Sequence, residues 1–355
     1  MSEFVTPPRS LCILRLSAIG DVCHIVPIVR TLQHAWPEMP ITWVIGRVEA
    51  RLLSLLPGVE FITIDKRSLR AGAVALRRAL RGRHFDVLLH MQTALRASLY
   101  STLIHATRRI GFDRARAREL QWLFTNDAIP ARRNEHVLDT YFGFTEALGL
   151  SERRLEWGLP IPAEAAAWAS RQIAAGERTL IVSACSSRRA RNWRAERYAA
   201  VIDHAVRQHG LRVLLCGGPT DYERDMAARI EGAAGVTVSN LVGTDTLPQL
   251  LALIARATVL LAPDSGPAHM ATMVGTPVIG VGATTRSARS GPYLSRQWCV
   301  DAYALAALKY RGRRAEDLPW NETIEDPGAM DLVDAAAVCA RLDALLARSG
   351  SATMG

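Results

Sequence analysis

The sequence predicts an α/β fold built from two Rossmann-like domains that follow one another in the chain. Its 355 residues exceed what one hydrophobic core usually serves. Short apolar runs alternate with segments of helical periodicity, which is typical of parallel sheets covered by helices. This alternation restarts after Leu159-Pro160-Ile161-Pro162, where two prolines favour extended chain. A single large α/β domain is the alternative.

In the first half, an apolar strand over Leu11–Leu16 leads through a glycine turn into a helix over Val22–Trp36. Further elements are expected as strands at Ile41–Ile45, Phe61–Ile64 and Val87–His90, and as helices at Arg47–Leu56 and Glu135–Leu148. These segments form an expected first domain over residues 1–160.

The second half repeats the pattern over an expected domain of residues 161–330. Strands are predicted at Leu180–Ala184, Val213–Cys216, Val259–Ala262 and Val278–Val281, and helices at Ala195–Gln208, Asp221–Ile230 and Ala268–Val274. Residues 331–355 are expected to form a C-terminal amphipathic helix over Asp331–Ala347 and a frayed end from Ser349.

Composition narrows the class of protein. A net charge of +9 and a pI near 9.7 favour an anionic partner, which nucleic acid, a nucleotide sugar or an anionic membrane surface would each satisfy. Nucleic acid is disfavoured because basic and aromatic residues do not interleave and no helix-turn-helix signature is present. Six scattered cysteines without a C-x-x-C pair, and no histidine spacing suited to zinc, predict buried free thiols and no metal site.

The location is expected to be cytoplasmic. The N-terminus lacks a basic start followed by an apolar run, so no export signal is visible. The longest apolar stretches, such as Ala257–Ala262, are strand-sized and shorter than the roughly 20 residues that cross a bilayer.

Ser17-Ala18-Ile19-Gly20-Asp21 is the first candidate site. It places a carboxylate at the start of a helix, after a glycine that allows close approach of a ligand. Ligands of open α/β sheets collect at such strand-to-helix loops. The alternative is that Asp21 is simply an N-cap.

Ala262-Pro263-Asp264-Ser265-Gly266-Pro267-Ala268-His269 is the second candidate, again between a strand and a helix. The backbone amides and the dipole at the start of this helix suit a diphosphate. A helix cap with an ordinary structural histidine is the alternative.

Ser186-Ser187-Arg188-Arg189-Ala190-Arg191-Asn192-Trp193 is the third candidate, because arginines make bidentate contacts with phosphate oxygens. A solvated basic loop is the alternative. The turn Gly217-Gly218-Pro219-Thr220-Asp221 lacks both G-x-G-x-x-G and G-x-x-x-x-G-K-[ST], so neither a dinucleotide oxidoreductase nor a P-loop enzyme is supported.

Four segments taken together resemble the ordered motifs of glycosyltransferase family 9: Arg15–Val22, Asn134–Asp139, Arg191–Trp193 and Asp264–His269. The resemblance covers nearly the whole chain. It implies a GT-B fold, with a cleft between the two domains, and an enzyme that moves L-glycero-D-manno-heptose from its ADP-activated form onto the inner core of lipopolysaccharide. It also implies inversion at the anomeric carbon, no metal and no cofactor beyond the nucleotide-sugar donor.

The resemblance assigns roles to individual residues. Asp21 matches the general base, and Asp264 and His269 match positions that hold the nucleotide sugar. Arg191 stands where the family usually has lysine, and Arg194 where proline is usual. The residues assigned to the diphosphate are Ser186, Ser187, Arg191, Ser265 and Gly266, and those assigned to the acceptor side are Ser17, Gly20, Gln92, Arg96 and Arg118.

The expected partners are therefore the nucleotide sugar and an anionic lipopolysaccharide precursor, with no nucleic acid. Because that acceptor is embedded in a membrane, peripheral association with the inner face of the inner membrane is a further hypothesis. Two alternatives stay open: a GT-B enzyme with another nucleotide sugar or a protein acceptor, and a non-catalytic protein that binds nucleotides or anionic glycolipid.

Overall fold

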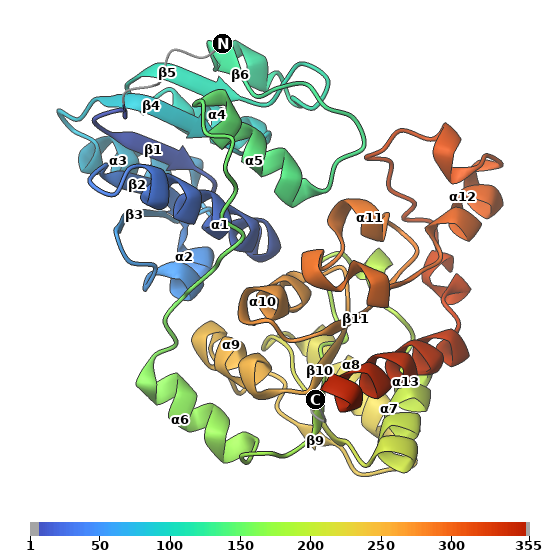
Figure 1. The fold of residues 1–355 in the computed structure, drawn as a ribbon. Helices are drawn as coiled ribbons and strands as arrows, with labels where there is room; N and C mark the ends of the chain where they lie inside the picture. Colours follow the sequence, from blue (N-terminus) through green and yellow to red (C-terminus); the bar gives the residue numbers. More distant parts are fainter. Residues whose placement is uncertain (1–6, 353–355) are drawn as a thin grey trace. The chain divides into compact units, whose positions relative to one another are not determined.

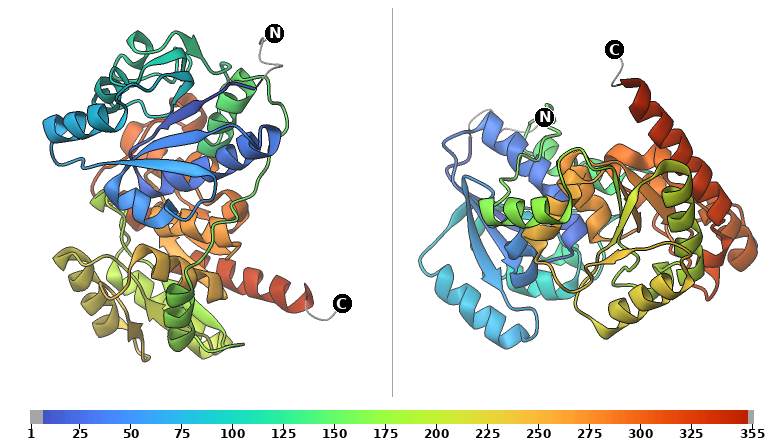
Figure 2. Two further views of the ribbon diagram at one scale, coloured as in Figure 1. Left: turned by 90° about the vertical axis from the view of Figure 1, so that its left-hand side faces the viewer. Right: turned by 90° about the horizontal axis from the view of Figure 1, so that it is seen from below.

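The computed structural model describes residues 7–352, which form two compact units divided between Pro160 and Ile161 (Figure 1). Each unit is a parallel six-stranded sheet with helices on its faces, as the two ribbon views in Figure 2 also show. Within residues 7–352, no helix is long and apolar enough to cross a membrane.

The first unit has strand order β3-β2-β1-β4-β5-β6, with every pair parallel. Its strands are β1 (Leu11–Leu14), β2 (Ile41–Gly46), β3 (Val59–Ile64), β4 (Phe85–His90), β5 (Ala106–Gly111) and β6 (Asp127–Ala128). Its helices are α1 (Ile19–Ala35), α2 (Arg47–Leu53), α3 (Leu69–Ala79), α4 (Leu95–Ser101), the 3-10 turn η1 (Gln121–Leu123) and α5 (Val137–Ala147).

The second unit repeats this topology as β12-β11-β10-β7-β8-β9. Its strands are β7 (Thr179–Val182), β8 (Arg212–Leu215), β9 (Ser239–Asn240), β10 (Val259–Pro263), β11 (Val278–Gly282) and β12 (Val300–Asp301). Its α-helices are α6 (Ala163–Gln172), α7 (Ala195–His209), α8 (Asp221–Ala233), α9 (Leu247–Arg256), α10 (Gly266–Val274), α11 (Ser287–Ser290), α12 (Tyr303–Arg311) and α13 (Ala335–Ala352). Its 3-10 turns are η2 (Arg189–Arg191), η3 (Tyr293–Trp298), η4 (Ala315–Asp317) and η5 (Ala329–Leu332).

In both units the order reverses beside the first strand, the topology of a doubly wound sheet. The central strands β1, β7 and β10 are buried at every position, which explains their continuous apolar runs. The predicted α/β class and the repeated doubly wound sheets are thus confirmed.

The edges of the sheets were less visible in the sequence. The expected strands did not include β5, because Arg108 and Arg109 interrupt its apolar character. Arg108 pairs with Asp127 at 2.5 Å, and Arg109 donates to the backbone carbonyls of Ser101 and Ile104 at 2.7 and 2.6 Å. These arginines fit a sheet because each finds polar partners within the unit.

The C-terminal helix begins later than predicted. Residues from Asp331 to Leu332 belong to η5, and α13 starts at Ala335. The carboxylate of Asp334 accepts a hydrogen bond from the Ala336 N–H at 3.4 Å, as expected of a residue just before a helix. The helix continues to Ala352, so residues 349–352 are helical, while the rest of the expected frayed end lies outside the described residues.

Candidate functional site

In the first unit, Asp21 stands in the first turn of α1, directly after the carboxyl end of β1. The N-cap residue of α1 is Ala18, so the alternative that Asp21 is the N-cap is wrong. Asp21 instead occupies the third helical position, where its Oδ2 accepts a hydrogen bond from the Ala18 N–H at 3.1 Å. An acidic side chain in the first turn also suits the positive end of the helix dipole.

Two further groups hold the Asp21 carboxylate. Arg15 forms an ion pair with Oδ2, and the Tyr141 hydroxyl donates to Oδ1 at 3.2 Å. Burial alone would lower the pKa of Arg15, but the charge of Asp21, the hydrogen bond to it and the nearby Tyr141 and Glu49 together outweigh this, and the pKa is raised. The Arg15 guanidinium is therefore permanently charged. The Asp21 side chain keeps 32% of its surface exposed, so a hydroxyl substrate can reach it.

The other predicted residues of the first unit separate into two groups. Gln92 lies beside the Ser17–Asp21 loop: its Oε1 accepts from the Leu16 N–H at 2.7 Å and its Nε2 donates to Ser17 Oγ at 3.4 Å. Gly20 belongs to the same first turn of α1 as Asp21. In contrast, Arg96 donates to the Lys66 carbonyl at 2.5 Å and Arg118 is exposed, and no hydrogen bond or ion pair of the described residues joins either to Asp21.

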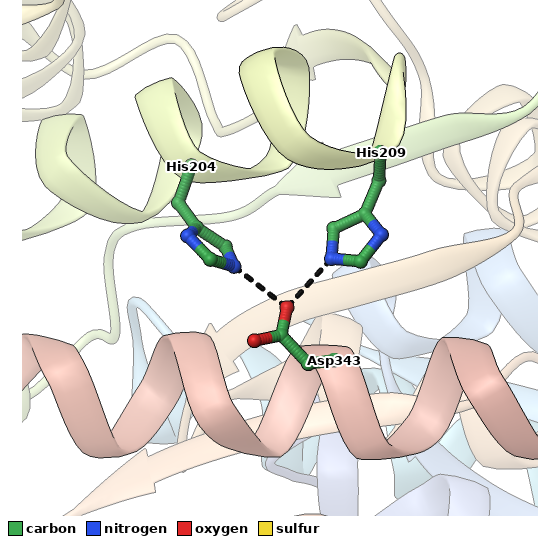
Figure 3. A group of neighbouring side chains, drawn as sticks. All are labelled: His204, His209 and Asp343. Carbon is green, nitrogen blue, oxygen red and sulfur yellow. Dashed lines mark hydrogen bonds and ion pairs between the residues drawn. The ribbon is translucent and has the colours of Figure 1, made fainter.

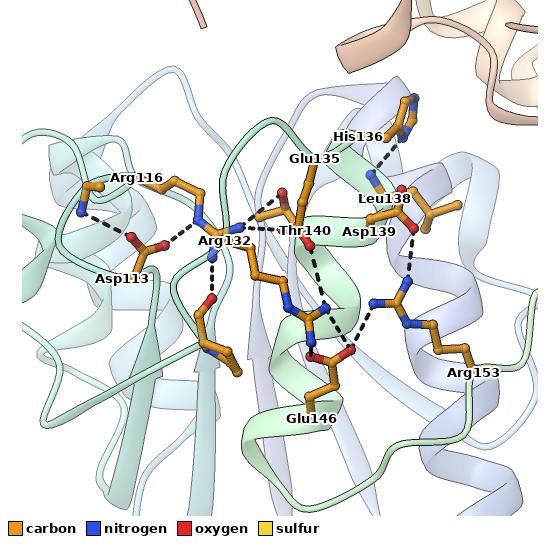
Figure 4. A network of polar contacts seen from close by, with 12 residues as sticks. Asp113, Arg116, Arg132, Glu135, His136, Leu138, Asp139, Thr140, Glu146 and Arg153 are labelled. Carbon is orange, nitrogen blue, oxygen red and sulfur yellow. Dashed lines mark hydrogen bonds and ion pairs between the residues drawn. The ribbon is translucent and has the colours of Figure 1, made fainter. Parts of the chain in front are cut away.

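The segment Asn134–Asp139, one of the four segments that resemble family 9, leads into α5 and takes part in a network of ion pairs (Figure 4). His136 is the N-cap of α5 and accepts from the Leu138 N–H at 3.0 Å through Nδ1. The acidic residues belong to a network of ion pairs that ties the loop before α5 to its surroundings. Its pairs are Arg116–Glu135 at 2.8 Å, Arg116–Asp113, Arg132–Glu146 at 2.8 Å, Arg153–Glu146 at 2.8 Å and Arg153–Asp139 at 3.0 Å.

In the second unit, Asp264 follows β10 and is surrounded by donors. Its Oδ2 lies 3.0 Å from Arg191 Nη1, and it accepts hydrogen bonds from Thr285 at 3.0 Å and Ser290 at 2.9 Å. Its Oδ1 lies 3.6 Å from His269 Nε2. Burial would raise the pKa of Asp264, but the contact with His269 and the charge of Arg191 outweigh it, and the pKa lies well below its usual range. Asp264 is therefore a carboxylate that fixes its neighbours in place.

Gly266 is the first residue of α10, two positions after Asp264. Ser265 is the N-cap residue, but its hydroxyl makes no capping hydrogen bond and is buried without a partner among the residues that the structure describes. A buried hydroxyl without a partner is costly unless a ligand or water completes it. Together with the free amides and positive dipole of the helix start, it makes this point of the unit suitable for an anion.

The loop after β7 brings Arg191 to this point. Asn192 Oδ1 accepts from the Ser186 N–H at 2.6 Å, which closes the loop on itself. The guanidiniums of the loop are engaged: Arg188 pairs with Glu325 at 2.7 Å, and Arg189 lies 4.5 Å from the centroid of the Tyr222 ring. Both side chains are nevertheless exposed, so the alternative of a solvated basic loop stays open for them. Ser187, the other predicted residue here, is exposed.

Sequence reasoning missed several groups that complete the two clusters, namely Tyr141, Thr285 and Ser290. The signal for Thr285 was available, because Thr284–Thr285 follows β11 at the same carboxyl edge of the sheet. Tyr141 had no such signal, because it lies within α5. Arg194, the second departure from the family pattern, is the N-cap residue of α7 and pairs with the two carboxylate oxygens of Asp331 through Nε and Nη2.

The two doubly wound units, with a partly exposed carboxylate in the first and a buried, unpartnered hydroxyl at a helix start in the second, have the architecture of the GT-B class. The model of the family described as glycosyltransferase family 9 (heptosyltransferase) matches residues 73–319. The chain is also 39% identical over 330 residues to the lipopolysaccharide core heptosyltransferase OpsX of Haemophilus influenzae, covering 93% of this chain and 95% of OpsX. The chain therefore belongs to glycosyltransferase family 9.

Other relatives are more distant. Lipopolysaccharide heptosyltransferase 1 of Escherichia coli K12 is 26% identical over 299 residues, 80% of this chain and 91% of that protein. Among solved structures, a family 9 glycosyl transferase from Veillonella parvula superposes with a TM-score of 0.78 at 20% identity and covers 96% of this chain and 97% of that chain. Escherichia coli heptosyltransferase WaaC with ADP gives 0.71 at 22% identity, covering 95% and 99%. These likenesses agree with the GT-B fold.

Proposed function

We propose that this glycosyltransferase moves L-glycero-D-manno-heptose from ADP-heptose to the inner core of lipopolysaccharide, with inversion at the anomeric carbon and without a catalytic metal. The observation that carries the proposal is the likeness to the core heptosyltransferase OpsX, which extends over nearly the full length of both chains. The geometry of the two clusters supports the chemistry that such a transfer requires.

Asp21 is the proposed general base. The acceptor hydroxyl attacks the anomeric carbon as its proton passes to the Asp21 carboxylate, and the bond from that carbon to the donor phosphate oxygen breaks. The electron pair of this bond leaves with ADP, and attack opposite the leaving group inverts the configuration. Arg15 and Tyr141 orient the carboxylate, and its exposed part is where the hydroxyl would approach.

The second unit is proposed to bind the donor. Arg191 and the amides at the start of α10 would neutralise the charge that develops on the departing diphosphate, and Ser265 would donate its unpaired hydroxyl. Asp264 would act by positioning Arg191 and His269, because its oxygens already carry protein contacts. Ser186 and Ser187 belong to the same loop and are proposed to line the phosphates.

Glu223 extends the donor site. It follows β8, the second strand of this unit, and its carboxylate lies over the Gly217–Gly218 turn: a Cβ at Gly217 would be 2.9 Å from Glu223 Oε2. In doubly wound nucleotide sites an acidic residue accepts hydrogen bonds from ribose hydroxyls. We assign this role to Glu223.

The acceptor is assigned to the first unit. Ser17, Gly20 and Gln92 lie around Asp21, and Arg96 and Arg118 are exposed cations that suit the carboxylates or phosphates of an anionic acceptor. An enzyme with such an acceptor is proposed to work in the cytoplasm, at the inner face of the inner membrane.

The test is transfer from ADP-heptose to truncated lipopolysaccharide acceptors by the wild type, Asp21→Ala and Glu38→Ala, with donor binding measured for each. Glu38 is an exposed carboxylate of the same unit and serves as the matched control. We expect Asp21→Ala to bind donor and lose rate by a factor on the order of 10² or more, and Glu38→Ala to keep its rate.

The same assay tests the finer parts of the proposal. The product should have the anomeric configuration opposite to that of the donor, and EDTA should leave the initial rate unchanged. If wild type binds the donor but transfers heptose to no core acceptor, the proposed acceptor class or chemistry is wrong. If wild type and Asp21→Ala transfer at equal rates, Asp21 is not the general base.

A further inference from the structure

Two histidines and an aspartate from different parts of the second unit meet on its surface (Figure 3). His204 and His209 lie on the last two turns of α7, and Asp343 lies on α13. Both Nε2 atoms are 2.6 Å from the same Oδ1 of Asp343. The three atoms lie within 4.8 Å of one another, and Figure 3 shows both imidazole rings directed from α7 toward α13.

Packing of the helices holds this arrangement in place. Ile202 and Ala205 of α7 and Val338 and Leu342 of α13 are buried in one hydrophobic cluster. Gly210, in the left-handed region at φ 62°, ends α7 immediately after His209. The backbones that carry the three side chains are thus set by the core and by the helix end, and the side chains need little ordering to act together.

We propose that His204, His209 and Asp343 form a site for a divalent transition metal such as Zn²⁺, which would tie the C-terminal helix to α7. Two imidazole nitrogens and one carboxylate oxygen are a common zinc donor set, with a solvent molecule as the fourth ligand. Ligand atoms around tetrahedral zinc lie ~3.3 Å apart, given bonds of ~2.0–2.1 Å. The distance from Asp343 Oδ1 to each imidazole nitrogen is now 2.6 Å and would have to lengthen to ~3.3 Å. The Asp343 side chain is 46% exposed and can move outward by this amount.

The electrostatic setting favours a cation. Both histidines lie near the carboxyl end of α7, where the helix dipole is negative. The nearby guanidinium of Arg207 is engaged elsewhere, because it pairs with Asp203 at 3.2 Å and donates to the Gly235 carbonyl at 3.3 Å. A metal ion would therefore bind where the carboxyl end of α7 and the Asp343 carboxylate both carry negative charge.

The role is structural. Arg191 precedes α7, whereas the histidines stand near its other end, 13 and 18 positions further along the chain. Only the positions from Ala195 onward are helical, and at 1.5 Å per residue the two histidines lie roughly 14 and 21 Å along α7 from its start, so the metal would not touch a diphosphate held by Arg191. We expect it to raise the stability of the second unit, because a ligand that binds only the folded state shifts unfolding by mass action.

The experiment is titration of the untagged, EDTA-stripped full chain with Zn²⁺, followed by calorimetry and by the melting temperature. Wild type should bind one Zn²⁺ and melt at a higher temperature. His204→Asn, His209→Asn and Asp343→Asn should each weaken binding by about tenfold or more and lose the shift. These positions are partly exposed, so the variants should fold.

Two controls separate this site from other metal binding. His105→Asn removes an exposed histidine of the first unit and should leave binding unchanged. Cys339→Ser removes the thiol one turn from Asp343 on α13 and should also leave it unchanged. Absence of zinc-dependent heat and melting shift in the wild type would overturn the proposal. The proposal would also be overturned if the three site variants bound Zn²⁺ as tightly as wild type does. It would be overturned as well if His105→Asn or Cys339→Ser weakened binding as much as the site variants do.

Discussion

Each unit has an aspartate after one of its two central strands, Asp21 after the first strand and Asp264 after the fourth, and the two carboxylates differ in what surrounds them. Asp21 follows β1 and has three donors and a side chain that is 32% exposed. Asp264 follows β10, is 15% exposed, and is contacted by Arg191, Thr285, Ser290 and His269. Loops after two different central strands thus provide a partly exposed carboxylate in one unit and a carboxylate enclosed by donors in the other.

The largest contrast should appear in stability. Asp264→Asn should lower the free energy of unfolding at pH 7 by about 2 kcal/mol, because a largely buried guanidinium loses its charged partner. Asp21→Asn should cost less, because the Asp21 carboxylate is already 32% exposed and Arg15 keeps its hydrogen bond from Nη1 to the Met91 carbonyl at 2.6 Å. Urea unfolding of both variants measures the difference, and equal costs would mean that the two carboxylates do not differ in this way.

The pH dependence of this effect follows from the lowered pKa of Asp264. A carboxyl with a lowered pKa in the folded state stabilises the protein above its ordinary pKa of about 4, and the contribution is lost as the pH falls further. The gap between wild type and Asp264→Asn should therefore be constant down to about pH 4 and narrow as the pH falls from about 4 to about 3. A gap that stays constant over this range would contradict the assignment.

Tyr141→Phe should have a smaller effect, and on catalysis alone. It removes the hydroxyl that donates to Asp21 Oδ1 and leaves the ring, so kcat should fall roughly fivefold, the equivalent of one hydrogen bond of about 1 kcal/mol. Donor affinity should not change, because none of the groups assigned to the donor belongs to the first unit. Steady-state transfer kinetics with a separate ADP-binding measurement distinguish this from a general loss of folding.

Arg194→Pro should have the smallest effect. Arg194 has φ −72° at the N-cap of α7, a value that proline adopts, and its side chain makes only an exposed pair with Asp331. We expect the melting temperature to change by less than about 2 °C and transfer to be retained. A larger drop in melting temperature or transfer rate would show that the ion pair between Arg194 and Asp331 helps to hold the loop that carries Arg191.

Much of the candidate site was predictable because it depends on local sequence. Loops at the carboxyl ends of parallel strands share one edge of a sheet, and the resemblance to family 9 assigned both Arg191 and Asp264 to the donor, which implies that the two are close together. The pair between them at 3.0 Å agrees with that expectation. The partners of Asp21 were harder to predict, because Tyr141 is separated from it by 120 positions.

The cluster of His204, His209 and Asp343 illustrates the same limit. The sequence contains no histidine spacing typical of zinc sites, and we predicted none on that ground. The cluster needs Asp343, which is 139 positions from His204. Only the packing of α13 against α7 brings its carboxylate to the two imidazoles.

The amino-acid sequence by itself determined the α/β class, the central strands, the three strand-to-helix loops and the resemblance to family 9, because each depends on residues close together in the chain. Tertiary structure decided which carboxylate stays open, which arginines are engaged, and which distant side chains complete each cluster. The physical reason is that charge and hydrogen-bond partners act over a few ångströms of space, and folding alone sets which residues come that near.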